Sequence, residues 1–131
     1  MSTPDLSHLE RHWNCRLTTT GRKSGTPRRV TIWFALGPGV VYLTGGAERP
    51  HWCRNLAADP AVTVEIGGER WRGRARIVED AREAESVRQR FVSRYLLARI
   101  SQLFGGYKTS VPVVITLEGR VAQAADGVGP A

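Results

Sequence analysis

The stretch "RWRGRARIV", residues 70–78, alternates small or apolar residues with arginines more regularly than any other part of the chain. Successive side chains of a β-strand point to opposite faces, so this pattern predicts a half-buried strand. The inner face would carry Trp71, Gly73, Ala75 and Ile77, and the outer face Arg70, Arg72, Arg74 and Arg76. A solvated outer face is the favoured interpretation of this arginine row, and contact with an anionic partner is the alternative.

Five further runs are rich in valine, isoleucine, threonine and aromatic residues and are bounded by glycine, proline or aspartate, which is typical of strands. They are residues 15–19, 30–36, 40–44, 62–66 and 111–117. The turn sequences "LGPGV" and "IGG" supply two hairpins. About six antiparallel strands predict a mainly β fold, a small closed or split barrel, because closure removes exposed sheet edges.

Helical spacing predicts three helices between or before these strands. A short lead-in helix is expected within residues 1–14, and a second over residues 50–58 that ends at Asp59-Pro60. A third begins near Asp80, a good N-cap, and continues to about residue 103, with Ile100 on its apolar side. Residues 122–131 are small and glycine-rich, so we expect a flexible tail.

Length and composition predict one globular domain over residues 1–131, since 41% of the residues are hydrophobic and 24% are charged. No apolar run approaches the ~20 residues of a membrane span, and nothing resembles a signal peptide. Cys15 and Cys53 lack a CxxC spacing and a disulfide framework, which favours free thiols in the cytoplasm. No metal-ligand pattern is present.

A second stretch, "TTTGRKSGTPRR" at residues 18–29, concentrates positive charge in a glycine-containing turn, within a chain of net charge +7. It is not a P-loop, because Arg22 separates Gly21 from Lys23 and the upstream glycine is missing. The cationic and hydroxyl donors suit one phosphate or carboxylate group. Nucleic-acid binding is disfavoured because no aromatic side chain interleaves with the basic ones.

A third stretch, residues 40–68, leads from a strand through Gly45-Gly46 to a helix start that carries Trp52 and Asn55. Bare backbone before a helix N-terminus suits a planar ring or an anion. The alternative is an ordinary connection in which Trp52 and Leu56 fill the core.

Taken together, "LTTTGRKSGTPR" at 17–28 and "YLTGGAERPHWCRNLAADPAVTV" at 42–64 resemble the deazaflavin-dependent nitroreductase family. The resemblance implies a split β-barrel of the FMN-binding, pyridoxamine-phosphate-oxidase-like type and the deazaflavin coenzyme F420. It also implies an oxidoreductase in which the cofactor delivers a hydride to a small electrophilic acceptor, a quinone, nitro compound or conjugated carbonyl, so that no catalytic side chain is required.

The same resemblance implies the site residues. The phosphate and acidic tail of the cofactor would lie along Arg22, Lys23, Ser24, Pro27 and Arg28, and the ring along Thr44, Gly45, Gly46, Ala47, Trp52 and Asn55. Trp33, Tyr107 and Lys108 are the substrate candidates. The sequence departs from the family at Thr44, since many members carry a lysine just before the glycine pair.

Several alternatives stay open at this point. The same basic turn could hold the single phosphate of FMN, or the chain could bind deazaflavin without turnover. Split barrels of this kind often form homodimers with the cofactor at the subunit junction, and the arginine row could lie near such a seam.

Overall fold

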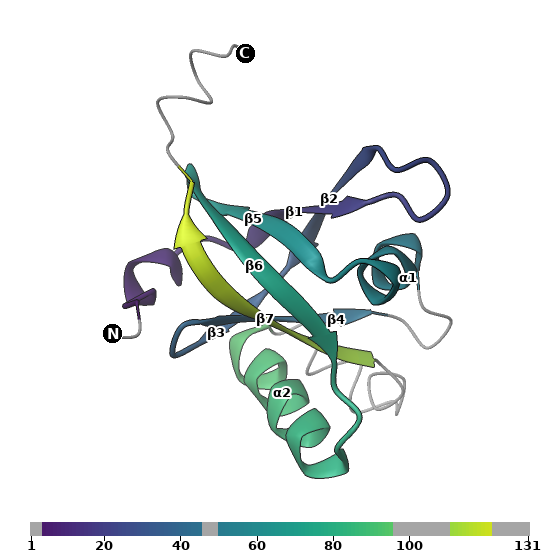
Figure 1. Cartoon of the computed structure of the whole chain (residues 1–131). Helices are drawn as coiled ribbons and strands as arrows, with labels where there is room; N and C mark the ends of the chain where they lie inside the picture. Colours follow the sequence, from purple (N-terminus) through teal and green to yellow (C-terminus); the bar gives the residue numbers. More distant parts are fainter. Residues whose placement is uncertain (1–3, 46–49, 96–110, 122–131) are drawn as a thin grey trace.

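The computed structural model describes residues 4–45, 50–95 and 111–121 (Figure 1). Its elements are η1 Ser7–Leu9, β1 Asn14–Thr20, β2 Pro27–Trp33, β3 Ala35–Gly37, β4 Val40–Gly45, α1 His51–Ala58, β5 Ala61–Ile66, β6 Glu69–Ile77, α2 Ala81–Arg94 and β7 Val111–Arg120. No helix among the described residues is long and apolar enough to cross a membrane. The prediction of a single domain over 1–131 stays a prediction, and the expected tail lies outside the described residues.

The seven strands form one antiparallel sheet in the order β2-β1-β5-β6-β7-β4-β3. The two edge strands, β2 and β3, are consecutive in the chain and are separated only by Phe34. One residue spans only about 3.3 Å of extended chain, so the opposite edges have to meet at this point. The sheet therefore curls into a half-barrel, which confirms the predicted split-barrel fold (Figure 1).

The single strand expected over residues 30–36 was wrong, because the structure divides it at Phe34. Phe34 and Ala35 are both buried, so the alternation of inward and outward side chains fails between them. The chain turns a corner there and crosses from one edge of the sheet to the other. This break accounts for seven strands where about six were expected.

Two apolar clusters fill the two sides of the sheet. The larger one occupies the inside of the half-barrel and includes Leu17, Val64 and Ile115, together with Cys53 and Leu56 from α1. The smaller one lies between α2 and the outer surface of β3, β4 and β7. Strand β7 is therefore buried on both sides over residues 112–115.

The first and the last of the three predicted helices differ from the structure. A lead-in helix was expected within residues 1–14, but among the described residues of this segment only Ser7–Leu9 are helical, as one 3₁₀ turn. The long helix begins at the Asp80 cap, as predicted, and α2 ends at Arg94, because Tyr95 is already extended at φ −121° and ψ 121°. The rest of the predicted helix, residues 96–103 with Ile100, lies outside the described residues. The Tyr95 ring stacks on Trp33 at 4.5 Å, and this tertiary contact draws the chain off the helix axis.

The arginine row of β6 is confirmed as the outer face of a half-buried strand. Gly73 and Ala75 are buried, while Arg72, Arg74 and Arg76 are exposed. Arg76 pairs with Glu83 of α2 at 2.5 Å, which lowers the pKa of Glu83 through a side-chain hydrogen bond. Such an exposed ion pair contributes little to stability.

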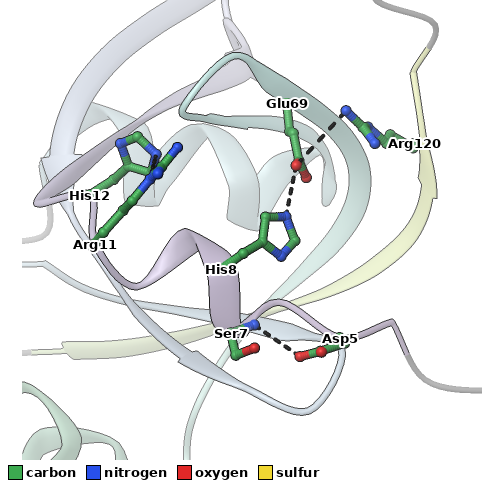
Figure 2. A network of polar contacts seen from close by, with 7 residues as sticks. All are labelled: Asp5, Ser7, His8, Arg11, His12, Glu69 and Arg120. Atoms are coloured by element: carbon green, nitrogen blue, oxygen red, sulfur yellow. Dashed lines mark hydrogen bonds and ion pairs between the residues drawn. The ribbon is translucent and has the colours of Figure 1, made fainter.

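A polar contact connects the N-terminal segment to the start of β6 (Figure 2). His8 Nε2 lies 2.7 Å from Glu69 Oε2 at the start of β6, and Arg120 of β7 approaches the same oxygen at 3.9 Å. The Asp5 carboxylate accepts a hydrogen bond from the backbone N–H of Ser7, which lowers the pKa of Asp5. The apolar anchors beneath these contacts are Leu6 and Leu9.

Candidate functional site

The basic turn between β1 and β2, residues 21–26, is closed by its own hydrogen bonds. The Gly21 N–H donates to Thr26 O and the Gly25 N–H donates to Gly21 O, each at 2.8 Å. Gly25 has φ +74°, a backbone angle that glycine adopts without strain. A Cβ on Gly21 would lie 2.7 Å from Ser24 Oγ, so the turn needs glycine there for close packing.

This turn, β2 and the start of α1 enclose a cavity of about 600 Å³, a size typical of cofactor sites. The residues around it come from segments that are distant in the sequence but adjacent in the fold. They are Thr19, Gly21, Arg22, Lys23, Ser24, Arg28, Arg29, Val30, Pro50, His51, Trp52 and Asn55.

Positive charge dominates this cavity. Arg22, Lys23, Arg28 and Arg29 line it, and no aspartate or glutamate belongs to its described lining. Within residues 4–45, 50–95 and 111–121, no carboxylate forms an ion pair with any of these four side chains. Converging cations without counter-charges raise the local potential and favour an anionic ligand.

A buried polar pair forms the floor of the cavity. Asn55 and Thr19 are only 4% and 2% exposed, and Asn55 Nδ2 donates to Thr19 Oγ1 at 3.3 Å. Asn55 Oδ1 accepts from the backbone N–H of Arg22 at 3.2 Å and from Arg22 Nη1 at 2.8 Å. These bonds connect α1 directly to the basic turn and satisfy the buried amide.

The start of α1 forms the opposite wall. Pro50 is its N-cap and provides no side-chain acceptor, and the partial positive charge of a helix N-terminus favours an anion nearby. Gly45 allows this close approach, because a Cβ there would lie 2.5 Å from Cys53 Sγ. Trp52 is half-buried and lines the cavity beside Val30, which gives the site one apolar surface.

The structure gathers some of the predicted site residues in this cavity and leaves others outside it. Those that line it are Arg22, Lys23, Ser24, Arg28, Trp52 and Asn55. Pro27 is exposed at the start of β2, Thr44 is half-buried on β4, and Gly45 lies beneath α1; none of the three lines it. Gly46, Ala47, Tyr107 and Lys108 lie outside the described residues.

Trp33, a predicted substrate residue, lies at the end of β2 remote from the basic turn. One face of its ring stacks on Tyr95, and the side chain is 40% exposed. Six lining residues were not among the site residues predicted from the sequence: Thr19, Gly21, Arg29, Val30, Pro50 and His51. Arg29 belongs to the same basic run as Arg28, and that run was the available signal for it.

Neither thiol is a credible nucleophile. Burial raises the pKa of Cys15 to about 12, so its thiolate is not formed near neutral pH. Cys53 is also fully buried, in the barrel core. Among the described residues, no group of three or more His, Cys, Asp or Glu side chains could hold a metal ion.

A curled antiparallel half-barrel with a cationic cavity beside a helix start defines a class, the pyridoxamine-phosphate-oxidase-like split barrels. A structure from Listeria innocua assigned to the pyridoxamine 5′-phosphate oxidases has a TM-score of 0.67 at 22% identity, over 88% of this chain and 92% of that one. A structure described as an F420 reductase has a TM-score of 0.62 at 20% identity, over 90% and 98%.

The particular family follows from the sequence. The model of the F420H2-dependent quinone reductase family matches residues 7–118, and the chain belongs to this family. It is therefore an F420-dependent oxidoreductase with a small-molecule substrate. A third structure, described as a domain-swapped dimer, has a TM-score of 0.62 at 27% identity, over 80% of this chain and 79% of that one.

Proposed function

We propose that this chain uses reduced F420 to reduce a small electrophilic acceptor, with a quinone as the preferred acceptor and nitro compounds or conjugated carbonyl compounds as the others. One observation carries the proposal: a cavity of about 600 Å³ that is lined by four cations and an indole, with no carboxylate in its described lining. An anionic cofactor with a planar ring needs this combination.

We assign the proposed binding roles according to the wall of the cavity on which each residue lies. Arg22, Lys23, Arg28 and Arg29 bind the phosphate and the acidic tail, and Ser24 adds a hydroxyl group. The positive end of the helix dipole at the start of α1 favours the same anionic portion. Trp52 offers its apolar face to the ring. The roles that the resemblance implies for Pro27, Thr44, Gly45, Gly46 and Ala47 stay predictions.

When bound, the cofactor supplies the hydride. The residues of the chain then need to bind the cofactor, orient it and neutralise its negative charge. The cations offset the charge of the ligand, and the fixed position of the basic turn on β1 and α1 orients the ligand before reaction. Since the thiol of Cys15 stays protonated, a covalent intermediate on it is not part of the proposal.

Binding is tested first, by titrating the protein with F420 and separately with FMN while following tryptophan fluorescence. Replacing both Arg22 and Lys23 with alanine removes two charged donors, each worth about 1.5–3 kcal/mol, and is expected to weaken F420 binding at least a hundredfold or so. The matched control replaces Arg72 and Arg74, two exposed arginines outside the cavity. Equal losses in both double variants would refute the site assignment.

Turnover is tested next, by following the oxidation of F420H2 with a quinone, a nitroaromatic compound and an enone in parallel. Fastest turnover with the quinone is the expected result. F420 binding without reduction of any acceptor would favour the carrier alternative, and tighter binding of FMN would contradict the cofactor.

The homodimer also stays a prediction. Light scattering on the purified protein at two concentrations tests it, and a mass near the 14.5 kDa of the single chain at both concentrations would contradict it.

A further inference from the structure

The guanidinium group of Arg22 is held from both sides by one helix. Asn55 Oδ1 accepts from Nη1 at 2.8 Å, and His51 Nδ1 lies 3.3 Å from Nη2. His51 and Asn55 are four residues apart on α1, and residues at this spacing lie on the same face of a helix. Arg22 is therefore fixed by a pair of side chains that sequence reasoning had not connected with it.

We propose that His51 and Asn55 are positioning residues, which keep Arg22 in the cavity as a preformed anion-binding group. This inference rests on the proposed function, because it concerns the same cavity. It differs from the role that the resemblance implies for Asn55, which is direct contact with the cofactor.

The hydrogen-bond chemistry fixes the orientation of both partners. A guanidinium group only donates, so the Asn55 atom that faces it has to be the amide oxygen. By the same argument, His51 Nδ1 accepts with its lone pair, and the ring proton of neutral His51 is on Nε2. Both contacts therefore leave the charge of Arg22 uncompensated, since neither acceptor is an anion.

The hydrogen bonds of Asn55 use its oxygen twice and one of its two amide N–H groups, which leaves one N–H group for a ligand. Its oxygen accepts from both the backbone N–H and Nη1 of Arg22, and its amide nitrogen donates to Thr19. Asn55 as a whole is only 4% exposed. Arg22, in contrast, uses two of its five guanidinium N–H groups on α1 and keeps three for an anion.

Preformation matters because a free arginine side chain has many rotamers, and ordering one on binding lowers affinity. Losing one of the two acceptors should weaken ligand binding roughly tenfold, the effect of freeing one long side chain. The loss has to act through Arg22. In a protein that already lacks the Arg22 side chain, removing His51 should therefore change the affinity very little. Removing Asn55 should have a smaller effect there than in the wild type, but not zero, because Asn55 also accepts from the backbone N–H of Arg22.

The test is a double-mutant cycle on the full chain, with the dissociation constant of F420 from fluorescence titration as its readout. His51→Ala is made in the wild-type and in the Arg22→Ala background. His51 is exposed, so this change should leave the fold intact, and a thermal melt of each variant checks it. Asn55→Ala is measured in the same two backgrounds.

A conservative variant separates positioning from simple loss of bulk. His51→Asn keeps an acceptor near the position of Nδ1 and should restore most of the wild-type affinity, whereas His51→Ala should not. The expected result is a roughly tenfold loss for His51→Ala that disappears in the Arg22→Ala background, and a loss for Asn55→Ala that becomes smaller there. The same loss in both backgrounds would mean direct contact with the ligand and would overturn the inference.

An unchanged affinity of His51→Ala and Asn55→Ala in the wild-type background would also overturn it. If wild-type protein binds F420 while the cycle shows no coupling, the proposed function stands and only this inference fails. If wild-type protein does not bind F420, both fail. Should Asn55→Ala not fold, the His51 series decides the question alone.

Discussion

Replacing Gly45 with alanine is expected to destabilise the fold at the junction of β4 and α1. A Cβ at this position would lie 2.5 Å from Cys53 Sγ, 3.3 Å from Pro50 Cδ and 3.4 Å from an atom of the Trp52 ring. The first distance is at least ~1 Å shorter than a favourable contact of about 3.5–4.0 Å. Because Cys53 is fully buried, its sulfur cannot move into solvent to relieve the clash.

The magnitude follows from the packing. Inserting a methyl group into a filled core costs about 1–3 kcal/mol, and the clash with sulfur places Gly45→Ala in the upper part of that range. Cys53→Ala alone removes one small buried group and should cost about 1 kcal/mol. In the double variant the new methyl group occupies the space of the lost sulfur, and the other two contacts are tight but tolerable. The two costs should therefore partly cancel.

Urea denaturation of the four proteins measures the free energy of unfolding in each case. The double variant is expected to be at least as stable as Gly45→Ala alone. F420 titration of the same proteins should show weaker binding for Gly45→Ala, since the displaced helix start carries Trp52. Additive destabilisation in the double variant would show that the Gly45–Cys53 contact does not explain the need for glycine, and would refute the reasoning.

Three further predictions concern stability. Gly67 and Gly68 have positive φ angles of +56° and +86°, a conformation that costs about 1–2 kcal/mol for alanine. Only a Cβ on Gly67 would also clash with the side chain of His12. Gly67→Ala should therefore lower the unfolding free energy more than Gly68→Ala; equal losses would contradict this. Tyr95→Phe removes a hydroxyl group that contacts three backbone groups, so urea denaturation should show an unfolding free energy lower by about 1–3 kcal/mol. An unchanged free energy of unfolding would mean that these contacts are weak. Burial raises the pKa of Cys15 from 9.0 to about 12, so on raising the pH the thiol loses its proton in the unfolded chain before it does so in the folded one. The free energy of unfolding should therefore fall between pH 9 and pH 12, by up to about 1.4 kcal/mol per pH unit. In alkaline denaturation, Cys15→Ala should remove this part of the pH dependence.

The strands were predictable wherever one side of the sheet faces the core and the other faces solvent. Residues 70–78 alternate because β6 has that environment, and the prediction was right to within a residue or two at each end. Phe34 shows the limit of this reasoning. The chain changes edges of the sheet at that residue, and a corner of one residue carries neither glycine nor proline to indicate it.

The site was predictable as a chemical composition, while its connections were not. The charges of Arg22 and Lys23 are visible in the sequence, and so is the helix start that carries Trp52. The bond between Asn55 and Arg22 joins residues 33 positions apart and depends on how α1 packs on β1. His51 gave no signal because a histidine at a helix start is unremarkable until its partner is known.

The position of β7 between β6 and β4 has a consequence for biosynthesis. The strands on its two sides, β2-β1-β5-β6 and β4-β3, are all translated before it. They have no common partner in the sheet until residues 111–120 leave the ribosome. The nascent chain therefore exposes an unpaired edge on β4 and, once β6 is made, a second one on β6 until β7 follows, and exposed edges promote aggregation. Barrel assembly should be a late step, so stalling translation before residue 111 is expected to yield chains that require a chaperone.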